Sequence, residues 1–143
     1  MKLKSILIAT LLVSSLLFLG CGTASSEVYS EYHLKVSCAK FQAYHHFISE
    51  IQLAVGDIIT VELCSNPTTG FQWEYETTDR TVLQETDHDF VPPGSDEPGT
   101  PGKDIWTFEA IEKGETELRM EYSRPWEGGE KGEWTYTLTV TVE

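Results

Sequence analysis

The last segment of the chain, residues 134–142, alternates strictly between apolar and hydroxylated side chains. Successive side chains of a β-strand point to opposite faces, so this period of two predicts a strand with one buried face that anchors the core. Segments 59–63, 106–110 and 118–122 alternate in the same way between apolar and polar residues. The apolar positions of the last segment are Trp134, Tyr136, Leu138, Val140 and Val142, and the hydroxylated ones are Thr135, Thr137, Thr139 and Thr141.

Turn signals rich in glycine, proline and asparagine separate these segments. They divide the chain after residue 28 into six to eight short strands, and a helix is hard to place after residue 20. The pattern predicts an all-β fold, an antiparallel β-sandwich. Residues 38–47 are compatible with a strand, a loop or a single helical turn. The turn signals lie at residues 55–57, 66–70, 92–102, 113–115 and 128–132.

Residues 1–20 have the composition of a secretory signal, with two lysines followed by an apolar run from Ile6 to Leu19. That run is shorter than the roughly 20 residues that span a bilayer. The sequence around Gly20-Cys21 resembles a lipobox, which predicts that Cys21 is lipidated and becomes the new N-terminus. Cleavage by ordinary signal peptidase nearby is the alternative. Both readings place the protein outside the cytoplasm, either anchored to the cell envelope by lipid or secreted, with residues 22–27 as a tether.

The charge balance limits the possible partners. Ten basic residues against 23 acidic ones give a net charge of −13, which argues against a nucleic-acid partner because phosphates would be repelled. No sequence motif typical of an enzyme is found, and His33, His45, His46 and His88 lack the spacing of a metal site. We therefore expect a non-enzyme that uses no cofactor and no metal.

Cys38 and Cys64 form an even pair once Cys21 is lipidated. In an oxidising compartment such a pair can form a disulfide. Two free buried thiols are the alternative, and the spacing alone does not decide between them.

The segment Asn66-Pro67-Thr68-Thr69-Gly70-Phe71 constrains its backbone at nearly every position. The asparagine side chain can cap the turn, the proline fixes φ, the two threonines are stiff at χ1 and the glycine permits a positive φ. We call residues 66–71 the first loop and expect it to be rigid.

A second unusual segment is Arg124-Pro125-Trp126-Glu127-Gly128, which we call the third loop. Its tryptophan lies outside any strand alternation, unlike Trp106 and Trp134. An exposed aromatic side chain among stiff neighbours is typical of a binding anchor. The alternative is that Trp126 folds back to cover one end of the core.

The first and third loops together, in this order on a β-sandwich pattern, resemble the chagasin family of protein inhibitors of papain-like cysteine proteases. The resemblance covers about residues 47–143, which leaves 21–46 as a tether and an N-terminal extension. It implies an immunoglobulin-like sandwich that acts as a monomer and wedges three loops into the active-site cleft of a protease.

The resemblance also implies a role for each loop. Thr68 and Thr69 would lie over the catalytic cysteine and histidine of the target, and Trp126 would stack on an aromatic side chain on the primed side. The second loop, Gly99-Thr100-Pro101-Gly102, would contact the non-primed side. Pro101 departs from the family's glycine-rich pattern there.

A carbohydrate- or cell-wall-binding module is the alternative function, because exported β-sandwiches with an exposed tryptophan often bind glycans. This reading accounts for Trp126 but leaves the stiff first loop unexplained.

Overall fold

The computed structural model describes residues 28–95 and 97–143. The predicted signal segment, Cys21 and the tether lie outside the described residues. The elements in chain order are β1 (Glu31–Val36), α1 (Cys38–Tyr44), β2 (His46–Leu53), β3 (Ile58–Ser65), the 3₁₀ turn η1 (Pro67–Thr69), β4 (Gln72–Thr77), β5 (Leu83–Val91), β6 (Gly102–Ala110), β7 (Gly114–Ser123) and β8 (Trp134–Val142).

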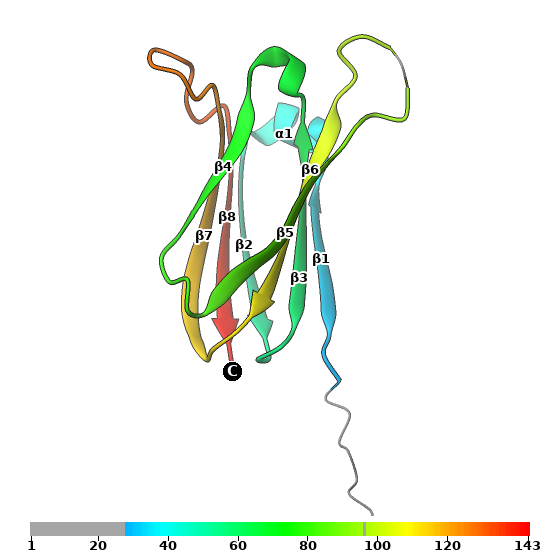
Figure 1. Cartoon of the computed structure of the whole chain (residues 1–143). Helices are drawn as coiled ribbons and strands as arrows, with labels where there is room; N and C mark the ends of the chain where they lie inside the picture. The colour runs from blue at the N-terminus through cyan, green and yellow to red at the C-terminus, as the bar shows by residue number, and fades with distance from the viewer. Residues whose placement is uncertain (1–27, 96) are drawn as a thin grey trace, which may run out of the picture.

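The strands form two four-stranded sheets that pack face to face, in the orders β1-β3-β6-β5 and β2-β8-β7-β4 (Figure 1). The predicted all-β sandwich is thereby confirmed. Two edge pairings differ from the antiparallel expectation, because β1 runs parallel to β3 and β2 runs parallel to β8. The helix α1 joins β1 of one sheet to β2 of the other, so the two edge strands are joined by a crossover and not by a hairpin.

The period-two segments provide the core as predicted. Their apolar residues point between the sheets and are buried, while the intervening residues, with the exception of the buried Glu62, are exposed or half-buried. Trp134, at the start of β8, is only partly buried and packs against the edge of this core. The buried members of the four segments are Ile59, Val61, Leu63, Trp106, Phe108, Ala110, Leu118, Met120, Tyr122, Tyr136, Leu138, Val140 and Val142.

The segment that the sequence left open forms α1, a seven-residue helix. Ser37 caps its start by accepting a hydrogen bond from the backbone of Lys40, and His45 ends it with a positive φ of 58°. Phe41 is fully buried and stacks on Trp134 with ring centroids 5.1 Å apart. Burial of one large aromatic side chain therefore fixes this short helix in place.

A disulfide joins Cys38, at the start of α1, to Cys64 near the end of β3, with the Cα atoms 4.9 Å apart. Of the two alternatives that the sequence left open, the structure therefore has the disulfide and not two free thiols. The bond fastens the N-terminal extension to the strand that leads into the first loop.

The first loop and the β5–β6 and β7–β8 connections gather at one end of the sandwich, with α1 beneath them, and the C-terminus lies at the opposite end (Figure 1). In residues 28–95 and 97–143, no helix has the length and apolar character needed to cross a membrane.

Candidate functional site

The first loop is a closed turn whose backbone bonds to itself. The N–H of Thr69 donates to the carbonyl oxygen of Asn66 at 3.1 Å, and the N–H of Gly70 donates to that of Pro67 at 3.0 Å. Gly70 adopts a φ of +82°, which a glycine reaches without strain. The stiffness predicted from the residue types is therefore matched by a 3₁₀ turn that ends in a left-handed glycine.

Asn66 connects the first loop to two other parts of the molecule. Its side-chain Nδ2 donates to the carbonyl oxygen of Gly99 at 3.0 Å, and its backbone N–H donates to the hydroxyl of Tyr122 at 2.7 Å. Its Oδ1 accepts the hydroxyl of Thr68 at 2.6 Å. The prediction that the Asn66 side chain caps the turn is thus wrong: no backbone N–H of the turn bonds to this side chain, which accepts the hydroxyl of Thr68 instead.

Pro67, Thr68 and Thr69 are exposed at the tip of the first loop. The hydroxyl of Thr69 donates to the carbonyl oxygen of Asn66 at 2.7 Å, and that of Thr68 donates to the Asn66 side chain. Both hydroxyl protons are used within the loop, so the tip offers a neutral surface of methyl groups, a proline ring and oxygen acceptors.

Arg124 of the third loop holds the first loop from the side. Its guanidinium lies over the ring of Phe71, 4.5 Å from the centroid, and its Nε donates to the carbonyl oxygen of Thr69 at 3.4 Å. Its Nη1 lies 3.8 Å from a carboxylate oxygen of Glu130. The arginine is thereby placed between the two loops as a bridge.

Trp126 is 53% exposed, as the sequence predicted for a residue outside the strand alternation. Its ring lies against Gly70, where an added Cβ would come within 2.6 Å of the indole. The N–H of Gly129 donates to the Trp126 carbonyl oxygen at 3.0 Å and closes the turn. The indole is therefore fixed on one side and open to solvent on the other.

Two of the residues predicted for the binding surface have other positions. Phe71 is buried, and its ring stacks on Tyr122 at 5.2 Å, so it supports the first loop from below. Gly102 is the first residue of β6. The remaining predicted positions, Gly99, Thr100, Pro101, Pro125, Glu127 and Gly128, lie on the connections at the loop end, and all but Thr100 are exposed.

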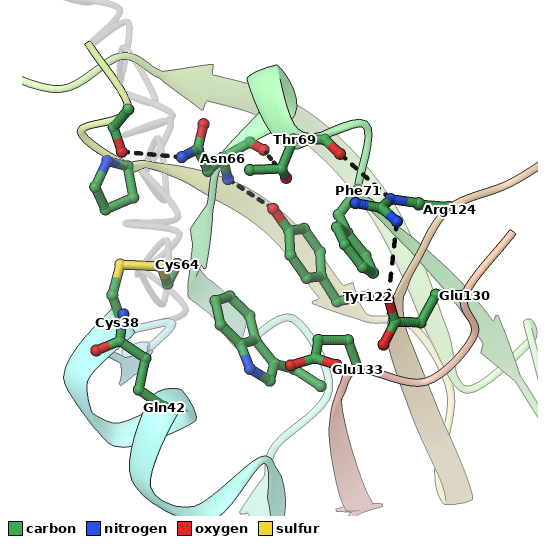
Figure 2. A pocket seen from close by; sticks show the side chains of 13 residues that line it. Cys38, Gln42, Cys64, Asn66, Thr69, Phe71, Tyr122, Arg124, Glu130 and Glu133 are labelled. Carbon is green, nitrogen blue, oxygen red and sulfur yellow. Dashed lines mark hydrogen bonds and ion pairs between the residues drawn. A yellow bond between two sulfur atoms is a disulfide. The ribbon is translucent and has the colours of Figure 1, made fainter.

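A hollow of about 430 Å³ opens between the three loops and α1. Figure 2 shows Asn66, Thr69, Arg124 and the Cys38–Cys64 disulfide around it. Tyr122 also borders this space, and the sequence placed it in the core without any signal of a contact with the first loop. The sequence could not reveal the contact between Tyr122 and Asn66, because these residues are 56 positions apart in the chain.

The four histidines each lie near a partner of their own. His33 is close to Glu62, His45 to Glu133, His46 to Thr135 and His88 to Asp104. In the described parts of the chain, no group of three or more His, Cys, Asp or Glu side chains could hold a metal ion.

Comparison with known proteins finds a family match and similar proteins in other organisms. The sequence profile described as "Chagasin family peptidase inhibitor I42" matches residues 52–140. Chagasin from Trypanosoma cruzi is 30% identical over 87 residues, which cover 58% of this chain and 79% of that protein.

Solved structures share the fold. A cysteine protease inhibitor from Entamoeba histolytica superposes with a TM-score of 0.61 at 24% identity, covering 80% of this chain and 97% of that one. PbICP-C, solved in complex with falcipain-2, superposes with a TM-score of 0.58 at 18% identity, covering 78% of this chain and 99% of that one.

Proposed function

The chain belongs to the chagasin family of peptidase inhibitors, and from this premise we propose that it inhibits papain-like cysteine proteases by filling their active-site cleft with its three loops. It acts as a monomeric inhibitor and not as an enzyme. Family membership favours this function over the carbohydrate-binding alternative.

The observation that carries the proposal is the pair of exposed threonines, Thr68 and Thr69, on a turn bonded to its neighbours on both sides. A substrate must present an extended backbone with a carbonyl aligned for attack. The first loop is closed by its own hydrogen bonds and ends in a left-handed glycine, so it occupies the cleft without that alignment. It blocks the nucleophile and is not cleaved.

Preorganisation supports tight binding. Association costs free energy for every side chain or loop that must be ordered on docking. Here Asn66 fixes the first loop to the second, and Arg124 fixes the third to the first. More of the contact energy is therefore available as affinity.

The third and second loops extend the contact to both sides of the first. The exposed face of Trp126 stacks on an aromatic side chain of the target's primed side, as a large, half-buried aromatic anchor does. Gly99, Thr100 and Pro101 face the non-primed side, where the proline gives this inhibitor a stiffer contact than a glycine would.

The test is the residual activity of papain during titration with the purified protein. Stoichiometric loss of activity is expected for the unaltered protein, and Thr69→Arg should raise the inhibition constant strongly because a long charged side chain at the tip blocks entry to the cleft. Thr139→Arg is the matched control, since Thr139 lies on the outer face of β8 between Glu50 and Glu117. Equal inhibition by the Thr69→Arg variant and the unaltered protein would mean that the first loop does not lie at the centre of the contact with the protease.

The N-terminal segment bears on where in or around the cell the inhibitor acts. We propose that Cys21 carries lipid and holds the inhibitor at the cell envelope. The mature protein should partition into detergent, and Cys21→Ser should release it. An unmodified N-terminus at a residue other than 21 would show that the protein is secreted instead.

A further inference from the structure

Tyr122 occupies a fixed position under the first loop. It is the second-last residue of β7, 2% exposed, and its ring lies in a cluster of aromatic side chains. The centroid distances are 4.8 Å to Trp134 and 5.0 Å to Trp73, and the ring is nearly parallel to that of Trp134. Because the ring cannot shift within this cluster, its hydroxyl has a fixed place as well.

That hydroxyl accepts the backbone N–H of Asn66 at 2.7 Å. The ladder between β3 and β6 ends one residue earlier, at the pair of Ser65 and Gly102. Asn66 is therefore the first residue after β3 whose backbone is not paired with β6, and its N–H bonds to the Tyr122 hydroxyl instead. A partly buried N–H without this acceptor would cost the free energy of an unmade hydrogen bond.

The position of Asn66 determines that of the loop tip. Its carbonyl oxygen accepts both the N–H and the hydroxyl of Thr69, and its side chain accepts the hydroxyl of Thr68. The same side chain donates to Gly99 in the second loop. One backbone position thus orders both threonines and joins two loops.

We propose that Tyr122 is a positioning residue for inhibition, whose hydroxyl sets the first loop through the backbone of Asn66. This inference rests on the proposed function and names a residue beneath the contact surface. With 2% exposure Tyr122 cannot touch a protease, so it acts through Asn66. It also lies two residues before Arg124, which bridges to the first loop from the other side.

The test is Tyr122→Phe, which keeps the stacked ring and removes only the hydroxyl. The amide of Asn66 should exchange with solvent about tenfold faster, followed by NMR well below the melting temperature, as expected for one lost hydrogen bond. The inhibition constant against papain should rise about tenfold, mainly through faster dissociation.

Tyr136→Phe is the matched control. Tyr136 is 1% exposed, and its hydroxyl interacts with Ser49 of β2, not with a loop. If lost stability alone weakened the inhibitor, this variant would weaken it too; we expect unchanged inhibition and unchanged exchange at Asn66.

Three outcomes would count against the inference: unchanged exchange at Asn66 in Tyr122→Phe, faster exchange with unchanged inhibition, or equal weakening by Tyr136→Phe. Failure of the unaltered protein to inhibit papain-like proteases would overturn the proposed function instead. In that case the exchange rate alone would decide whether Tyr122 holds the loop.

Discussion

Trp126 packs its indole against Gly70 and leaves 53% of its surface exposed. Gly70 allows this approach because it has no Cβ, and its φ of +82° ends the turn that carries the two threonines. Gly70 thus determines both the shape of the tip of the first loop and the surface against which the Trp126 indole packs. Substitution of Trp126 should act on binding more than on folding, whereas any side chain at Gly70 would strain the turn itself.

Trp126→Ala should weaken protease binding by about 2–4 kcal/mol, which is roughly a 30- to 1000-fold loss of affinity, the range of interface hot spots. The midpoint of thermal unfolding should hardly change, because the half-exposed indole contributes little to the core. The inhibition constant and the melting curve are measured on one preparation.

Trp106→Ala serves as the contrast. Trp106 is 2% exposed in β6, so its truncation should destabilise the fold by about 3–5 kcal/mol. If Trp126→Ala lowered stability as much as this variant does, Trp126 would be a cover for the core and not a binding anchor.

The strands could be predicted from the sequence because alternation of apolar and polar residues is a local signal. Their partners could not, since a period of two does not specify which strand lies beside which. The parallel pairs β1–β3 and β2–β8 depend on the crossover through α1. The sequence also left open whether residues 38–47 form a strand, a loop or a helical turn, because the seven residues of α1 are stabilised by the burial of Phe41 and the disulfide at Cys38, which are tertiary effects.

The disulfide should contribute about 3 kcal/mol to the free energy of unfolding, because the bond closes a chain segment with a separation of 26 residues. The double variant Cys38→Ala/Cys64→Ala should show this loss in urea denaturation at pH 7. Unaltered protein treated with a reductant should lose a similar amount. A difference below about 1 kcal/mol would mean that α1 is held by Phe41 alone.

The sheet that contains β1 and β3 has an acid-sensitive charge cluster around Glu62. Burial raises the pKa of this carboxyl, but hydrogen bonds and attraction from Lys35 and Lys103 outweigh it, so the pKa falls below its ordinary value of 4.5. The unfolded state therefore binds the proton more readily than the folded state does. This contribution to stability is present above pH 4.5 and is lost as the pH falls through the lower, folded pKa.

Glu62→Gln should lower stability at pH 7 and flatten the loss of stability on acidification, measured as urea midpoints between pH 7 and pH 3. Glu112→Gln, at an exposed position in the β6–β7 turn, is the control and should leave the acid profile unchanged. An identical acid profile for Glu62→Gln and the unaltered protein would assign the acid sensitivity to other carboxyls.

The molecule as a whole separates its loop end from its C-terminal end. Residues far apart in the sequence form the loop end: positions 66–71, 99–101 and 124–128 meet there, with α1 beneath them (Figure 1). The motifs themselves could be recognised from the sequence, and so could the exposure of Trp126. The bonds that join the loops, from Asn66 to Gly99 and from Arg124 to Thr69, could not, because they depend on which strands are neighbours, β3 beside β6 and β4 beside β7.

The net charge of −13 should speed association with a positively charged protease, and the charges near the loop end should contribute most to this effect. Glu97 and Glu127 are exposed in the connections at that end, while Glu112 and Glu115 are exposed in and beside the β6–β7 turn at the other (Figure 1).

The double variants Glu97→Gln/Glu127→Gln and Glu112→Gln/Glu115→Gln remove the same charge from opposite ends. With a papain-like protease of net positive charge, the first variant should slow association about two- to threefold at low salt and the second much less, since steering depends on charge near the contact. Both differences should vanish near 1 M salt, where the screening length is about 3 Å. Equal slowing by both variants would mean that the charge acts through the molecule as a whole, and stronger slowing by the second would mean that the other end meets the protease first.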